Sequence, residues 1–233
     1  MQQRDNTATP PRPPLSTAIA VLLDETGSMD ICRDDAIAGF NAWLRSQQEL
    51  GDPCTLTLVT FSDRAGAPLC RLVHEGLSIP EVAPLTRETY TPGGNTPLYD
   101  AVVRTIRWMD RLRPRPERVL MVILTDGAEN ASREHTLRQV HDLIREREAT
   151  GHWTFVYLAA NQDAWATGGH MGIGAGNIAA FLTQDAHGAF GAVAEAIRAF
   201  RSSRTRAAGD FWRTGRPSGG PAPTRPGPRR RRR

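Results

Sequence analysis

The sequence predicts an α/β fold in which a mostly parallel sheet is covered by helices on both faces. Short apolar runs rich in β-branched residues alternate along the chain with longer segments of helical periodicity. Three of these runs, 16–24, 118–125 and 153–160, are almost continuously apolar. Such runs are typical of parallel strands that are buried on both faces.

The remaining elements follow from apolar spacing and from turn residues. Residues 54–62 alternate between apolar and polar and predict a strand, and 69–77 predict a weaker strand that pairs with it in a hairpin. Residues 177–182 predict a short edge strand, whereas the glycine-rich segment 161–176 gives no clear pattern. Helices are predicted at 31–50, 97–112, 133–149 and 187–203.

Length and charge predict one domain with two tails. The 233 residues divide into a proline-rich, disordered segment 1–14, a domain over 15–203 and a basic tail over 204–233. This tail holds ten arginines and one acid, so it accounts for the formal net charge of +4 and leaves the domain net acidic. The basic character of the whole chain therefore does not indicate a nucleic-acid-binding domain.

Composition also excludes several kinds of chemistry. The chain has no lysine, which excludes a Schiff-base lysine and a P-loop lysine. Cys32, Cys54 and Cys70 lie far apart and form no C-x-x-C pair, so neither a disulfide framework nor a zinc site is indicated. This cysteine usage predicts a cytoplasmic protein. No apolar run approaches the ~20 residues that a membrane span needs.

Three polar segments point to a shared cation site. Asp24-Glu25-Thr26-Gly27-Ser28 and Thr125-Asp126-Gly127 lie where two apolar strands end, and Gly94-Asn95-Thr96 precedes a helix. Ligand sites of open α/β sheets lie at the carboxyl ends of strands. Carboxylate and hydroxyl oxygens are ligands for hard divalent cations, so the pattern predicts Mg²⁺, with Mn²⁺ or Ca²⁺ as alternatives.

Together the three segments resemble the metal-ion-dependent adhesion site of von Willebrand factor A domains. The resemblance identifies Asp24, Thr26, Ser28, Thr96 and Asp126 as metal ligands, with Thr26 at a position where the family more often has serine. It implies a Rossmann-like three-layer fold with one antiparallel edge strand. Segment 160–164, Ala-Asn-Gln-Asp-Ala, is similar to small stand-alone bacterial and phage members.

The resemblance also implies a function. Such domains bind protein partners through the metal, usually without catalysis, and an Asp or Glu of the partner would complete the metal's coordination shell. Asn95, Glu129 and Asn130 are predicted at the rim as partner contacts, whereas Glu25 and Asp30 are expected to be solvated neighbours. Small relatives act beside AAA+ ATPases or in stress and phage-defence gene sets, and the sequence does not select among these partners.

Simpler interpretations exist for each segment and for the whole chain. Asp24, Ser28 and Thr96 each fit a helix N-cap, and Asp126-Gly127 fits an ordinary turn; only their combination favours a metal. One functional alternative is a nucleic-acid-associated scaffold that acts through the arginine-rich tail 204–233. Another is a Mg²⁺-dependent phosphohydrolase of the haloacid dehalogenase type, which needs a second acid where this chain has Thr26.

Overall fold

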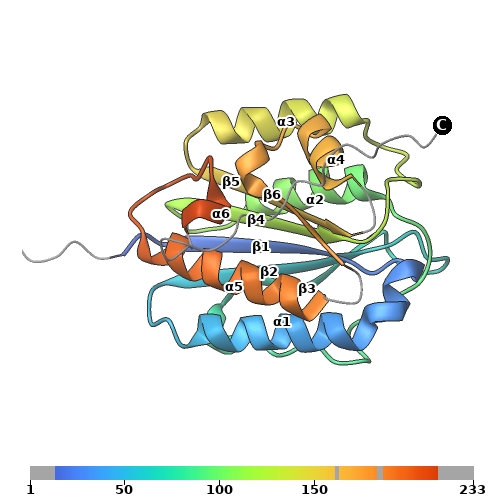
Figure 1. Ribbon diagram of the computed structural model, residues 1–233, viewed down its shortest axis with the longest axis horizontal. Helices are drawn as coiled ribbons and strands as arrows, with labels where there is room; N and C mark the ends of the chain where they lie inside the picture. The colour runs from blue at the N-terminus through green and yellow to red at the C-terminus, as the bar shows by residue number, and fades with distance from the viewer. Residues whose placement is uncertain (1–13, 161–162, 183–185, 215–233) are drawn as a thin grey trace, which may run out of the picture.

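The computed structural model describes residues 14–160, 163–182 and 186–214, and its centre is a six-stranded sheet (Figure 1). The strand order is β3-β2-β1-β4-β5-β6. All neighbours pair in parallel except β2 and β3, which form the antiparallel edge that the sequence predicts. The strands are β1 (Thr17–Asp24), β2 (Cys54–Phe61), β3 (Cys70–Ser78), β4 (Arg118–Thr125), β5 (Trp153–Ala160) and β6 (Ile178–Phe181).

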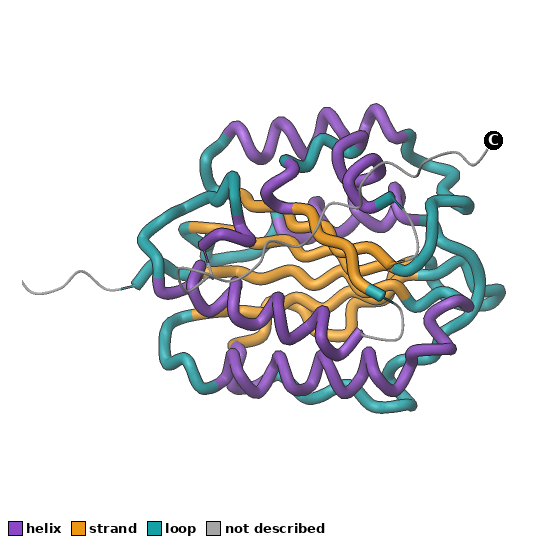
Figure 2. The backbone as a smooth tube through the Cα atoms, in the orientation of Figure 1, coloured by secondary structure: helices purple, strands orange, loops and turns teal. Residues whose placement is uncertain are grey.

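Helices cover both faces of this sheet, so the predicted three-layer α/β fold is confirmed (Figure 2). One core cluster joins a face of the sheet to α1 and α5, and the other joins the opposite face to α2, α3 and α4. The α-helices are α1 (Arg33–Gln48), α2 (Leu98–Met109), α3 (Leu137–Ala149), α4 (Ala164–His170), α5 (Ala186–Ser202) and α6 (Phe211–Thr214). Short 3₁₀ helices are η1 (Gly27–Cys32), η2 (Ile79–Glu81) and η3 (Ala175–Asn177).

Strand β1 lies in the middle of the sheet, and all eight of its residues are buried. Ile19, Val21 and Leu23 belong to the core with α1 and α5. Ala18 and Leu22 point to the opposite face and belong to the core with α2. Burial on both faces explains why the sequence of this strand shows no polar alternation.

Two helices begin two or more residues later than predicted, for local reasons. The segment before Arg33 winds as the 3₁₀ helix η1, so α1 begins two residues later than predicted. Helix α3 begins at Leu137 instead of 133, because Thr136 and Gln139 form a capping box that fixes the first turn. The glycine-rich segment without a clear pattern contains α4, whose first turn is capped by the side chain of Asp163.

The predicted boundary between domain and tail at 203/204 is wrong, because residues 204–214 pack onto the domain. Phe211 is fully buried, and its backbone N–H donates to the Asn177 side chain at 2.8 Å. The backbone N–H of Ala208 donates to Thr154 Oγ1 at 2.8 Å. In the sequence, Phe211 and Trp212 stand among arginine, glycine and proline residues and show no helical or strand periodicity. The sequence pattern therefore does not predict that this segment packs onto the domain. Segments 1–13 and 215–233 lie outside the described residues.

Buried Arg118 holds the end of helix α5 against the sheet. Its guanidinium donates to Thr17 Oγ1 at 2.8 Å and to four backbone carbonyls. These carbonyls belong to Phe200, Arg201, Ser203 and Thr205, at and just beyond the last turn of α5. The last carbonyls of a helix lack partners within it, so Arg118 caps α5 from strand β4. Among the described residues, no helix combines the length and apolarity needed to cross a membrane.

Candidate metal centre

The candidate centre lies where β1 and β4 end side by side. The two strands pair in parallel with Leu23 opposite Leu124, so Asp24 and Thr125 leave the sheet at the same edge. From β1 the chain continues to β2 on one side of the strand, whereas β4 lies on the other side. This reversal of strand order is the topological switch point at which open α/β sheets bind ligands.

The first loop is anchored by the Asp24 carboxylate, which is fully buried. One of its oxygens accepts from the Thr26 backbone N–H at 2.8 Å, and the other accepts from Thr125 Oγ1 at 2.5 Å. The hydroxyls of Thr26 and Ser28 lie 3.3 Å apart. One carboxylate therefore joins the end of β1, the turn that follows it and the end of β4.

The third segment closes on the first through Asp126. Ser28 Oγ donates to Asp126 Oδ1 at 2.6 Å, although the two residues are 98 positions apart. Thr26 and Asp126 are buried, whereas Ser28 is exposed. The oxygen cluster is consequently deep on the Asp24 side and open to solvent on the Ser28 side.

The second segment brings Thr96 to the same place. The Gly27 N–H donates to the Gly94 carbonyl at 3.0 Å, which joins the first and second loops. Thr96 Oγ1 lies so close to Gly127 that a Cβ added there would be 2.7 Å from it. Only glycine at 127 leaves this hydroxyl room, and the three segments of the predicted site are thus brought together.

Gly94 has a conformation that no other residue fits. Its φ is +79°, and an added Cβ would lie 2.6 Å from the backbone of Asp63. Gly66 has the same φ, but an added Cβ would meet nothing within 4 Å. The two glycines therefore share the same φ and differ in steric contact.

We expect Gly94→Ala to destabilise the protein by at least about 2 kcal/mol more than Gly66→Ala. Both substitutions carry the cost of a positive φ, about 1–2 kcal/mol, and only the first also pushes against the Asp63 backbone. Equilibrium urea unfolding of the two variants measures the difference. Equal losses would show that the loop carrying Thr96 moves freely away from Asp63.

The donor set fits a hard divalent cation. All five predicted ligands present oxygen atoms, and two pairs of these oxygens lie 2.6 Å (Ser28 to Asp126) and 3.3 Å (Thr26 to Ser28) apart. Adjacent ligands of an octahedral Mg²⁺ are about 3 Å apart, given Mg–O distances of about 2.1 Å. Two carboxylates would balance the charge of the ion, while the open side leaves a place for an external ligand.

Electrostatics in the cluster favour a cation as well. Burial raises the pKa of Asp24 to about 6, and the nearby Asp126 charge adds to this rise. Burial also raises the pKa of the Asp126 carboxyl. Among the described residues, neither carboxylate forms an ion pair. Two ionised, partly desolvated acids in this position are destabilising unless a positive charge accompanies them.

The three residues predicted as partner contacts differ in how far internal hydrogen bonds already occupy them. Asn95 is exposed, and its backbone carbonyl accepts from Asp63 N–H at 2.9 Å. Asn130 Oδ1 accepts from the Thr96 backbone N–H at 2.8 Å, so this side chain holds the ligand loop in place. The Glu129 carboxylate accepts from the N–H groups of Tyr99, Ala131 and Ser132 and from the Ser132 hydroxyl. Partner contact by Glu129 or Asn130 would compete with these internal bonds.

Glu25 is buried, contrary to the expectation of a solvated neighbour. Both of its carboxylate oxygens lie 2.8 Å from Arg71 Nη2, and one also accepts from the Thr91 backbone N–H. Glu25 thereby connects the metal loop to β3 and to the segment before Gly94. Arg71 is 46 residues away, and no local pattern in the sequence pairs it with Glu25.

Two further polar features have roles that the sequence pattern does not reveal. Thr125 belongs to one of the three segments, but its role of positioning Asp24 depends on the pairing of β1 with β4. Asp100, Glu134 and His135 lie close enough to share a metal ion. However, Asp100 already accepts from three backbone N–H groups, at positions 133–135, and contacts His135 Nδ1, which suits a structural clip between α2 and this loop.

Comparison with solved structures identifies the fold. No protein-family profile matches the sequence, and no curated protein is similar to it. The ArnB paralog VWA2 from Sulfolobus acidocaldarius matches with a TM-score of 0.55 and 15% identity, over 78% of this chain and 45% of that one. The pilus adhesin SpaC from Lactobacillus rhamnosus GG matches with a TM-score of 0.66 and 11% identity, over 80% of this chain and 31% of that one.

A third structure corresponds to the fold over nearly its whole length. The vWF domain of the type V pili tip protein Mfa5 from Porphyromonas gingivalis has a TM-score of 0.57 and 8% identity. The match covers 82% of this chain and 98% of that domain. The chain spans less than half of the first two proteins. At these identities the similarity concerns the fold alone.

Proposed function

The chain has the von Willebrand factor A fold, and we propose that it is a metal-dependent docking domain that captures a carboxylate of another protein. The observation that carries this proposal is the bond from Ser28 to Asp126, which closes an oxygen cluster from segments 98 positions apart. Asp24, Thr26, Ser28, Thr96 and Asp126 would hold the ion, with Mg²⁺ as the first candidate and Mn²⁺ or Ca²⁺ as alternatives.

In such a site, different residues of the chain would have different roles. When bound, the cation supplies a positive charge with a coordination position that an external Asp or Glu can occupy. Buried Asp24 fixes the loop through Thr26 and Thr125, which keeps the hydroxyl ligands oriented. Ser28 lies on the open side, where an incoming carboxylate would arrive. The proposed activity is binding without catalysis.

The phosphohydrolase alternative receives less support from the same geometry. A second acid would be needed two residues after Asp24, where Thr26 presents a hydroxyl that lies 3.3 Å from Ser28. The nucleic-acid alternative depends on residues 204–233, of which only 204–214 are described and pack onto the domain. The proposed docking site lies at the ends of β1 and β4, where the polar side chains of the three segments converge.

The test measures capture of partner proteins from a native lysate, once with excess Mg²⁺ and once with chelator. We expect one or a few proteins to be retained by the wild type only with Mg²⁺, and by Asp126→Ala under neither condition. Asp142→Ala is the matched control, because Asp142 is an exposed acid on α3. Retention that is unchanged by chelator, or by Asp126→Ala, would contradict the proposal. An AAA+ ATPase or a stress or defence protein is the partner that the sequence resemblance suggests.

A further inference from the structure

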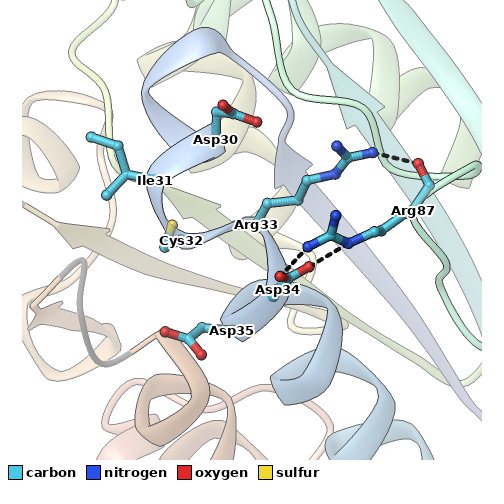
Figure 3. Close-up of a pocket in the computed structure, with 7 residues that line it drawn as sticks. All are labelled: Asp30, Ile31, Cys32, Arg33, Asp34, Asp35 and Arg87. Atoms are coloured by element: carbon cyan, nitrogen blue, oxygen red, sulfur yellow. Dashed lines mark hydrogen bonds and ion pairs between the residues drawn. The ribbon is translucent and has the colours of Figure 1, made fainter.

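A hollow beside the candidate centre has a distinct chemical character. Its volume is about 320 Å³, and it is lined by η1 and the start of α1 together with Arg87 (Figure 3). The wall contains Ile31, which is 85% exposed. Single exposed apolar residues are common on proteins, so Ile31 alone decides nothing. Ile31 becomes informative because it lies next to a ligand loop and lines the same hollow as two exposed acids, Asp30 and Asp35.

Some charged side chains around this hollow have partners among the described residues, and others do not. The Arg87 guanidinium forms an ion pair with Asp34, and Arg33 donates to the carbonyls of Tyr90 and Arg87. Figure 3 shows both arginines on one side of the η1–α1 corner, with Ile31 and Asp35 on the other. Asp30 and Asp35 are exposed, and neither side chain forms a hydrogen bond or an ion pair with the described residues. The side that carries Ile31 is therefore apolar and also carries the negative charge of Asp35, whereas the charge of Asp30 acts on Arg87 as well.

The spacing places this surface within reach of a segment held at the centre. Ile31 follows Ser28 by three residues within a 3₁₀ helix, which is one turn, or about 6 Å of rise. An extended peptide advances about 3.3 Å per residue. Side chains one or two positions from a carboxylate bound beside Ser28 would thus meet Ile31 and its acidic neighbours.

We propose that the partner segment carries, within two residues of its metal-binding acid, an apolar side chain that covers Ile31 and an arginine or lysine that pairs with Asp30 or Asp35. This inference rests on the proposed function and adds to it the chemistry of the partner. The metal selects the carboxylate, and the hollow selects its neighbours. A purely acidic segment would be repelled by Asp30 and Asp35.

The test uses an array of capped heptapeptides with a central aspartate and with leucine, alanine, arginine or glutamate permuted at the flanking positions. Labelled full-length protein is applied in Mg²⁺ and in chelator. We expect the strongest Mg²⁺-dependent binding from peptides with leucine and arginine within two positions of the aspartate. Ile31→Ser should weaken the leucine-containing peptides about tenfold, the loss of about 1.4 kcal/mol of apolar contact, while Ile31→Leu retains them.

Charge reversal supplies the second arm of this test. Asp35→Arg should shift the preference at the flanking positions from arginine towards glutamate. Mg²⁺-dependent stabilisation of Ile31→Ser and Asp35→Arg equal to that of the wild type shows that their metal centres are intact. Mg²⁺-dependent binding that ignores the flanking residues, or that is unaltered by Ile31→Ser, overturns the inference and leaves the docking function standing. Absence of Mg²⁺-dependent binding by every peptide overturns both.

Discussion

Replacing Asp24 by asparagine is expected to abolish stabilisation by Mg²⁺ without weakening the protein in chelator. Asparagine keeps the shape of the side chain and can still accept from the Thr26 N–H. Its amide can donate to Thr125 Oγ1, whose own hydroxyl proton can then go to the Gly127 carbonyl, 3.0 Å away. The substitution therefore removes a charge and leaves the hydrogen bonds satisfied.

The sign of the effect in chelator follows from the pKa of Asp24. Burial raises this pKa from 3.8 to about 6, so the folded state disfavours the ionised carboxylate at pH 8. The cost is present above the folded pKa and absent below the unfolded one; a shift of this size corresponds to about 3 kcal/mol. Asp24→Asn should thus be as stable as the wild type in chelator at pH 8, or more stable by about 1–3 kcal/mol.

The opposite result is expected with metal. A ligand at 100 times its Kd stabilises the folded state by about 2.7 kcal/mol, and this should appear in the wild type and be missing in Asp24→Asn. Thermal unfolding with Mg²⁺ and with chelator measures both effects. Asp142→Asn, an exposed acid on α3, is the control and should respond to Mg²⁺ as the wild type does. A full Mg²⁺ response in Asp24→Asn would place the cation elsewhere.

Replacing Arg118 by alanine is expected to produce the largest loss of stability, about 3–5 kcal/mol. The side chain is fully buried, and its removal leaves the carbonyls of Phe200 and Arg201 without their donor. The guanidinium also lies 4.6 Å from the centre of the Phe200 ring, so packing is lost with the charge. Burial lowers the pKa of Arg118, yet the group stays protonated at neutral pH.

Equilibrium urea unfolding and thermal melting measure this loss. For a domain of this size, 1 kcal/mol corresponds to about 2–4 °C, so the midpoint should fall by about 6–20 °C. Arg138→Ala is the control: its side chain is 92% exposed and 3.8 Å from Asp142, and a change within about 0.5 kcal/mol is expected. If Arg118→Ala were no worse than Arg138→Ala, the end of α5 would not depend on this cap.

The sequence by itself determined the alternation of strands and helices and the content of the ligand segments. Continuous apolar runs predicted β1, β4 and β5, because burial on both faces leaves no polar position in a strand. The segments containing Asp24, Thr96 and Asp126 were recognisable because each carries its oxygen atoms within a few residues. These signals are local, so they survive without knowledge of the fold.

Only the tertiary structure decided which of the polar residues are free and where the domain ends. Glu25 is buried by Arg71, Asn130 holds Thr96, and Asn177 binds the backbone of Phe211. In each case the partner lies 34–46 positions away, and its identity depends on which loops and strands become neighbours. A side chain's own chemistry sets what it can bind, but burial and distance set what it does bind.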